Sequence, residues 1–209
     1  MKKLSWLVAV TLISLIFMTA SGQTQPDFTQ TEKTELLGYA RECLTAQLAG
    51  NPSPPPPDCA TRQQRACFVT FFNGRRVFAC FGGFSPRRAT LGEEISENVR
   101  LALKNDHRSR KIQLETARRS GVQITFPAQP VRVADYRSID PVHEGMFVES
   151  GEKGVAFVPG EARTAAWAFR EALRRLGVTD AASVQVYSFQ ATSLSARSLI
   201  TQSAILMTW

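Results

Sequence analysis

Cys80 is the side chain in this sequence best suited to chemistry, because a glycine pair, Gly82-Gly83, follows it closely. A cysteine thiolate can act as a nucleophile, and the bare amides of a glycine turn can hold an oxyanion. A nucleophilic cysteine needs a low thiol pKa and, as a rule, a nearby base. The histidines of the chain are His107 and His143, and no spacing places either of them beside Cys80. Two interpretations of Cys80 therefore stay open: a nucleophile, or one half of a disulfide.

The segment that follows Cys80 has the composition of an anion site. Glycine amides, two cations and the start of a helix can together hold a negative group. The alternative is a tight turn with solvated arginines. The candidate ligand-binding residues are Phe81, Gly82, Gly83, Arg87 and Arg88.

The motifs of several common enzyme classes are absent from the sequence. There is no Gly-x-Ser-x-Gly elbow, no Walker loop, no dinucleotide glycine fingerprint and no His-Glu-x-x-His. The hydrophobic fraction of 44% excludes a disordered chain, and no run of five like charges suggests a nucleic-acid tail. We expect no cofactor, no metal and no nucleic-acid partner.

The first 22 residues have the pattern of a secretory signal peptide. Lys2 and Lys3 precede an uncharged apolar run, Leu4–Met18, and the small residues Ala20 and Gly22 suit a signal peptidase. Cleavage there lowers the net charge from +7 to +5, because the segment holds two lysines and no acid. The alternative is an uncleaved anchor that keeps the protein at the envelope. We expect a periplasmic or extracellular protein without stable membrane insertion after cleavage.

An even number of cysteines in an exported chain favours disulfides. A two-residue turn at Asn73-Gly74 would place Cys67 opposite Cys80, where Cα atoms ~4.5 Å apart permit a bridge. The expected pairs are Cys67–Cys80 and, by remainder, Cys43–Cys59. The alternative is a zinc site, which lacks any Cys-x-x-Cys pair here.

Helices and hairpins alternate along the chain without regular βαβ units. This order predicts an α+β domain with a mainly antiparallel sheet and three to four helices. The expected elements are helices at 31–49, 90–104, 113–120 and 161–176, hairpins around 73–74 and 150–153, strands at 121–126 and 184–191, and a proline connector at 51–58. The expected organisation is a signal peptide at 1–22, a flexible segment at 23–34, a domain at 35–192 and a tail of uncertain structure at 193–209.

This order of elements, from about Glu35 to Thr192, resembles the AMMECR1 domain family. In the central signature, where the family has Leu-Arg-Gly-Cys-Ile-Gly-Thr, Cys80 and Gly82 are identical, whereas Phe78, Ala79 and Gly83 replace Arg, Gly and Thr. Further matching segments are the helix at 35–50, Phe68-Val69-Thr70-Phe71, Phe84-Ser85-Pro86, Asp106-His107-Arg108-Ser109, Glu144-Gly145, the hairpin segment at 154–159 and Leu176-Gly177.

The resemblance implies a two-lobed fold with a cleft near the signature. Asp106 and Arg108 would then either line that cleft or form a surface turn in which Asp106 caps backbone amides. We expect an exported domain that binds an unknown protein or small molecule in the cleft near Cys80–Pro86. The alternative function is an enzyme of unknown type that uses Cys80 with Asp106 and Arg108.

Overall fold

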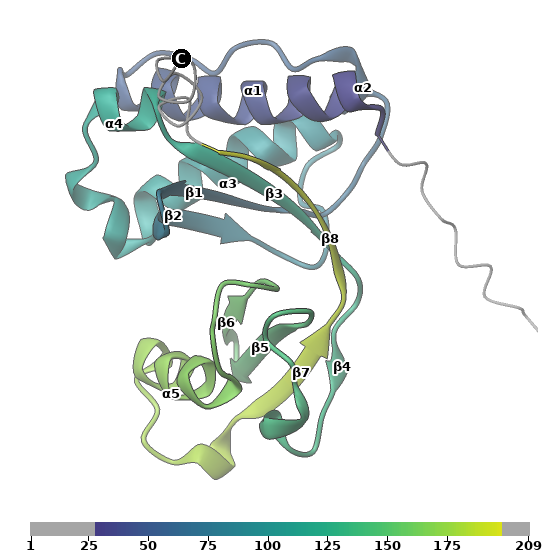
Figure 1. The fold of residues 1–209 in the computed structure, drawn as a ribbon, viewed down its shortest axis with the longest axis vertical. Coiled ribbons are helices and arrows are strands. Elements are labelled where there is room, and N and C mark those ends of the chain that lie inside the picture. The colour runs from purple at the N-terminus through teal and green to yellow at the C-terminus, as the bar shows by residue number, and fades with distance from the viewer. Residues whose placement is uncertain (1–27, 198–209) are drawn as a thin grey trace, which may run out of the picture.

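The computed structural model describes residues 28–197 and places them in two lobes stacked one above the other (Figure 1). Each lobe has its own four-stranded antiparallel sheet, with the strand orders β2-β1-β3-β8 and β4-β7-β5-β6. The predicted two-lobed, mainly antiparallel α+β fold is confirmed, but the described residues form five α-helices and not three to four, since the four-residue α2 was not predicted. The predicted signal peptide lies outside the described residues. Between residues 28 and 197 no helix has the length and apolar character needed to cross a membrane.

The first lobe packs its helices on one face of its sheet. Its buried core includes Leu36 and Leu44 from α1, Ile95 and Val99 from α3, and Phe71 from β1. The elements of this lobe are α1 (Gln30–Leu48), α2 (Asp58–Thr61), β1 (Phe68–Asn73), β2 (Arg76–Gly82), α3 (Leu91–Asn105), the short 3-10 helix η1 (His107–Lys111), α4 (Leu114–Arg118), β3 (Gly121–Pro127) and β8 (Ala191–Ala196).

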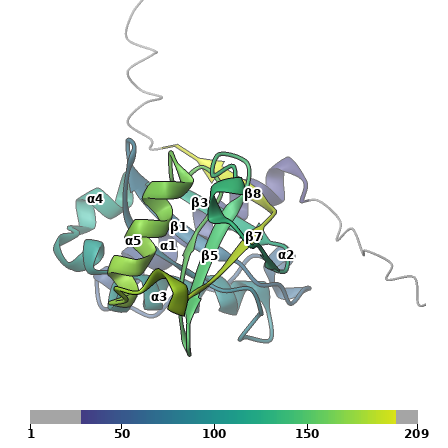
Figure 2. The ribbon, with the colours of Figure 1, turned by 90° about the horizontal axis from the view of Figure 1, so that it is seen from below.

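The second lobe is smaller and carries one α-helix. That helix, α5, packs against β5 and β6 on the side of the sheet away from the first lobe (Figure 2). The elements of this lobe are β4 (Val131–Arg132), η2 (Tyr136–Ser138), β5 (Gly145–Ser150), β6 (Lys153–Phe157), α5 (Ala165–Leu176), η3 (Ala181–Ser183) and β7 (Gln185–Phe189).

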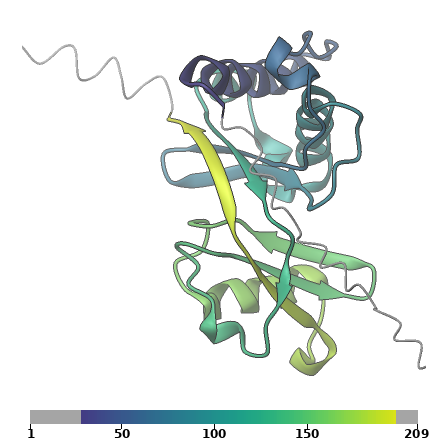
Figure 3. The same cartoon turned by 90° about the vertical axis from the view of Figure 1, so that its right-hand side faces the viewer.

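The chain passes between the lobes twice, from β3 to β4 and from β7 to β8. Figure 3 shows β7 and β8 as a nearly continuous ribbon that leaves the second lobe and joins the first beside β3. Strand β8 extends to Ala196, four residues beyond the predicted domain end at 192. The local sequence gave no signal for this strand, because its partner β3 lies about seventy positions earlier and only the crossover brings the two together.

Local signals fixed some helix ends and misplaced others. Thr90 and Glu93 form the predicted capping box of α3, and Gly177 ends α5 with φ 71°. Helix α1 begins earlier than predicted, with Thr29 as its N-cap, so residues 30–34 of the predicted flexible segment are helical. Helix α5 begins later than predicted, because the Thr164 side chain caps it, and this leaves Glu161 in a loop.

The register of the first hairpin excludes the predicted Cys67–Cys80 bridge. The turn is Gly74-Arg75, since Asn73 pairs with Arg76, and a bulge between Phe71 and Phe72 shifts the register again. As a result Cys80 lies opposite Thr70. All four cysteines, Cys43, Cys59, Cys67 and Cys80, are free thiols, so the predicted Cys43–Cys59 bridge is absent as well.

Candidate functional site

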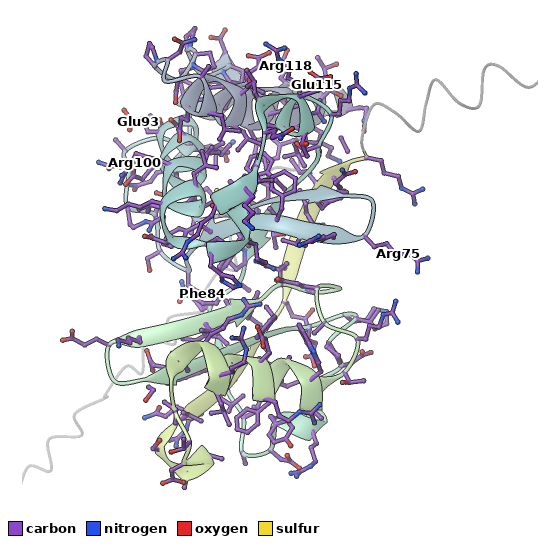
Figure 4. The ribbon with its side chains drawn as sticks, turned by 90° about the vertical axis from the view of Figure 1, so that its left-hand side faces the viewer. Arg75, Phe84, Glu93, Arg100, Glu115 and Arg118 are labelled. Atoms are coloured by element: carbon purple, nitrogen blue, oxygen red, sulfur yellow. The ribbon has the colours of Figure 1, made fainter. Side chains whose placement is uncertain are left out.

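A cleft of about 680 Å³ lies between the lobes. The first lobe lines it with the end of β2, the loop after it and the start of η1, and the second lobe with β5, β6 and the end of α5. Phe84 points into the space between the lobes (Figure 4). Of the predicted site residues, Cys80, Phe81, Gly82, Gly83, Asp106 and Arg108 all line this cleft. The structure therefore brings the signature and the Asp106–Arg108 segment together, although they are far apart in sequence.

Asp106 joins the two segments. It follows α3 and caps η1, where its carboxylate accepts the backbone N–H of Arg108 at 3.0 Å. The other carboxylate oxygen accepts the backbone N–H of Cys80 at 3.0 Å. Because β2 is the edge of its sheet, this N–H has no partner strand, and Asp106 supplies the acceptor that a neighbouring strand would provide. Asp106 therefore lines the cleft and also caps backbone amides, but its side chain is nearly buried and not on a surface turn.

The Arg108 guanidinium connects Asp106 with the second lobe. Its Nε lies 3.0 Å from Oδ1 of Asp106 and its Nη2 2.7 Å from Oδ2, a bidentate pair. Its Nη1 lies 3.6 Å from Oε1 of Glu161, in the loop between β6 and α5. The side chains of Asp106 and Glu161 are each 8% exposed and that of Arg108 is 22% exposed. One arginine therefore holds two nearly buried carboxylates, one from each lobe.

The two carboxylates have pKa values shifted in opposite directions. Burial opposes the ionisation of Asp106, but hydrogen bonds from Arg108 and from the Cys80 amide outweigh it and lower the pKa. Burial raises the pKa of Glu161, and the charges of Arg108 and Arg175 offset only part of that rise. The contact of Arg108 with Glu161 is thus weaker than its contact with Asp106. The longer nitrogen–oxygen distance, 3.6 Å against 2.7 Å, indicates the same.

The Cys80 thiol lies on the cleft side of the first sheet. Its Sγ accepts a hydrogen bond from the Thr70 hydroxyl at 3.2 Å. Burial, and next the negative charge of Glu161, raise the pKa of the thiol to about 12. A thiol in such surroundings is protonated at neutral pH and lacks the electropositive setting of reactive cysteines.

The other three thiols are deeper. Cys67 is fully buried on the helix side of the sheet, where the Asn98 amide lies 3.5 Å from its Sγ. Burial raises the pKa of Cys67 to about 12. Cys43 is also fully buried, and Cys59 is 3% exposed. Cys80 is therefore the cysteine with access to the cleft.

The predicted anion site at Arg87 and Arg88 is already filled by the chain itself. Both backbone N–H groups donate to one carboxylate oxygen of Glu94, at 2.8 and 3.1 Å. The Arg87 guanidinium binds the other oxygen of Glu94 at 3.1 Å and the side-chain oxygen of Asn98. Glu94 is fully buried. The grouping of amides and cations predicted for an external anion thus holds an internal one, and Arg87 and Arg88 do not line the cleft.

Thr70 and Glu161 are cleft-side partners that sequence analysis did not select. The alternation of strand β1 places Thr70 on the face of Phe68, which could have been deduced from the sequence. Glu161 was assigned to a helix, although Pro159-Gly160 before it and Thr164 after it favour a turn followed by an N-cap. Among residues 28–197, no group of three or more His, Cys, Asp or Glu side chains could hold a metal ion.

Comparison with known proteins gives one family and one fold. A family model described as AMMECR1 matches residues 37–194. No curated protein matches the chain. Among solved structures, the crystal structure of the uncharacterized protein PH0010 from Pyrococcus horikoshii is similar, with a TM-score of 0.63 and 18% sequence identity over 79% of this chain and 92% of that one. At this identity the likeness shows a shared fold.

Proposed function

The chain belongs to the AMMECR1 family, and from that premise we propose that it is a binding protein whose inter-lobe cleft takes a small ligand or a short segment of a partner. In this proposal Cys80 contributes to the cleft wall as a neutral thiol. The Asp106–Arg108–Glu161 group sets the separation of the lobes.

The observation that carries this proposal is that Asp106 and Arg108 are occupied with each other. Asp106 accepts the Cys80 amide, the Arg108 amide and two guanidinium nitrogens, so its oxygens are engaged. Recruiting either side chain as a base or an anion clamp would break a nearly buried pair, which is costly. These residues are therefore suited to hold the cleft in shape.

The remaining cleft surface suits an apolar or aromatic ligand group. Phe81, Phe84 and Phe147 are partly exposed and line the cleft from both lobes. The rings of Phe84 and Phe147 meet edge to face, with centroids 5.0 Å apart. Binding sites commonly combine such aromatic walls with a few polar groups that orient the ligand.

The alternative function, an enzyme that uses Cys80, keeps one specific observation in its favour. The Asp106 carboxylate accepts the backbone N–H of Cys80, and the charge of Arg108 acts against burial to lower the pKa of the Cys80 thiol, as an activating group would. The partner of the thiol, however, is the Thr70 hydroxyl, which donates to sulfur and is no base at neutral pH. Activity would require a rearrangement that lowers the pKa of Cys80.

Gly83 offers a direct test of cleft binding. A Cβ atom at Gly83 would meet nothing closer than 3.9 Å, so a leucine there fills cleft space without backbone strain. Small-molecule fragments that bind the mature chain are first identified by ligand-observed NMR. We expect Gly83→Leu to lower their binding affinity by about tenfold or more, without loss of thermal stability. Gly38→Leu, on α1 with nothing within 4 Å of its Cβ position, is the matched control. Equal binding by both variants would place the ligand elsewhere.

We also propose that the protein works outside the cytoplasm. The support is the charged, apolar and small-residue pattern of residues 1–22. Intact mass of the protein recovered from the periplasm or medium tests this, with loss of residues 1–22 expected. A full-length mass in the membrane fraction would instead support the uncleaved anchor.

A further inference from the structure

The connector between α1 and α2 is a polyproline segment on the surface of the first lobe. Residues 51–58 read Asn-Pro-Ser-Pro-Pro-Pro-Pro-Asp, and Pro57 has φ −66° and ψ 154°, the values of a polyproline II helix. That helix has three residues per turn, so residues three apart lie on one ridge. The segment therefore presents three ridges with different surroundings.

One ridge is attached to the body of the lobe. The Ser53 hydroxyl oxygen accepts from the Gln47 amide at 3.3 Å and from the Ser96 hydroxyl at 2.7 Å. One turn later, Pro56 packs on Gly92 of α3 so closely that a Cβ at Gly92 would lie 2.4 Å from the Pro56 side chain. These contacts, from two helices, hold the segment in a single orientation.

The next ridge points to solvent. Pro52, Pro55 and Asp58 are exposed, whereas the residues between Pro52 and Asp58 other than Pro55 are at least partly buried. Asp58 forms no ion pair with the described residues. A shallow hollow lies on each side of Pro52, one bordered by α1 and α4 and the other by α1 and α3.

We propose that this ridge, Pro52-x-x-Pro55, with Asp58 beyond its end at the start of α2, is a docking surface for a partner domain with an aromatic-lined groove that reads polyproline II helices. Such grooves accept prolines spaced at P-x-x-P, and the preformed helix spares the partner the entropy of ordering a flexible peptide. The exposed carboxylate of Asp58 requires a cation at the end of the groove that faces it. The surface lies on the outer side of the first lobe and is independent of the inter-lobe cleft.

The test uses the mature chain and a panel of purified SH3, WW and EVH1 domains as probes, with binding followed by NMR titration. We expect at least one domain to bind, and Pro55→Ala to weaken it about tenfold or more. Pro54→Ala is the matched control, because it changes the same residue type on a different ridge and should alter affinity less than about twofold. Asp58→Lys should also weaken binding, since it reverses the charge at the end of the ridge.

A second measurement tests the role of the rigid scaffold. The free octapeptide of residues 51–58 should bind the same domain more weakly than the folded chain, because it lacks the contacts of Ser53 and Pro56. The proposal is overturned if no domain of the panel binds, or if Pro54→Ala and Pro55→Ala weaken binding equally. It is also overturned if sedimentation shows that the ridge serves self-association, with a dimer that Pro55→Ala dissociates.

Discussion

Two of the contacts between the lobes have opposite chemistry. The first, the aromatic joint, consists of Phe68 and Phe84 from the first lobe and Phe147 and Phe189 from the second, with neighbouring ring centroids 4.9–6.2 Å apart. The second, the ionic joint, consists of Asp106, Arg108 and Glu161.

The two joints differ in what they supply to the fold, stability in one case and positioning in the other. Burial of aromatic rings is favourable and tolerates small shifts. Burial of charges carries a desolvation cost that good geometry only offsets, so an ionic contact adds orientation more than free energy. We infer that the aromatic joint holds the lobes together and that the ionic joint fixes the backbone of Cys80 and the width of the cleft.

The aromatic joint should give the largest loss of stability when broken. Phe189 is 2% exposed, stacks on Phe68 and meets Phe84 edge to face. Phe189→Ala should lower the free energy of unfolding by about 3–5 kcal/mol, measured by urea denaturation. Val142→Ala, at a residue 56% exposed, is the control and should change it by less than about 0.5 kcal/mol. A loss below about 1 kcal/mol for Phe189→Ala would mean that the aromatic joint does not hold the lobes.

Removal of the Asp106 side chain should lower the free energy of unfolding by less than Phe189→Ala does. Asp106→Ala leaves the Cys80 amide without an acceptor and leaves Arg108 with Glu161 as its remaining partner. We expect a loss of about 2–3 kcal/mol, below the usual cost of breaking a fully buried pair, because Arg108 keeps one carboxylate and some solvent contact. Urea denaturation measures it.

A double variant sharpens this prediction. Asp106→Asn with Arg108→Met removes both charges of that pair, and Glu161, whose pKa burial already raises, can then take up a proton; the double variant should therefore recover part of the stability lost in Asp106→Ala. If the double variant is less stable than Asp106→Ala, the ionic joint contributes net stability. The two joints would then not differ in the way inferred above.

Substitution of Glu161 should have the smallest effect on stability, and the effect should depend on pH. Its folded-state pKa is raised above 4.5, so its contribution to stability is full below about pH 4.5 and is lost as the pH rises through the folded pKa. Asp106 has a lowered pKa, so its contribution is full above its unfolded pKa of 3.8 and is lost only at more acidic pH. Glu161 is therefore the member of the joint whose contribution falls as the pH rises above about 4.5, and Asp106 is the member whose contribution falls at acidic pH.

Glu161→Gln isolates that effect. Relative to this variant, the natural chain should gain stability as the pH falls from 7 toward about 4.5, as followed by urea denaturation at pH steps between those values. The gain should stay below the loss seen for Asp106→Ala. Parallel pH profiles for the two chains would show that Glu161 carries no raised pKa.

Elements with local signals were predictable from the sequence, and contacts made through the fold were not. The capping box at Thr90 and the glycine that ends α5 depend on neighbouring residues and were predicted correctly. The predicted hairpin register was wrong for two reasons. The turn is Gly74-Arg75 and not Asn73-Gly74, and a bulge between Phe71 and Phe72 shifts the pairing further. The local sequence carries no signal for either change. The disulfide prediction failed with that register.

In the candidate site, too, some features could be predicted from the sequence, whereas contacts made through the fold could not. Resemblance to a family left two places for Asp106 and Arg108, the cleft or a surface turn, and the structure places both in the cleft, with Asp106 bonded to the backbone of Cys80. The internal anion Glu94 was missed, because the same amides and cations suit a buried carboxylate as well as a ligand. Glu161 was missed because the start of α5 was assigned four residues too early.

Cys80 stands in the cleft as a neutral thiol beside a binding surface, and alkylation kinetics measure that state. A pKa of about 12, against an ordinary value of 9.0, leaves far less thiolate at pH 7.5 than in the unfolded chain. Iodoacetamide labelling, mapped by mass spectrometry, should modify Cys80 about 100-fold or more slowly in the native protein than in urea. Cys80→Ser identifies any signal from the three deeper thiols. Labelling of native Cys80 faster than in urea would contradict the account and identify Cys80 as an activated nucleophile.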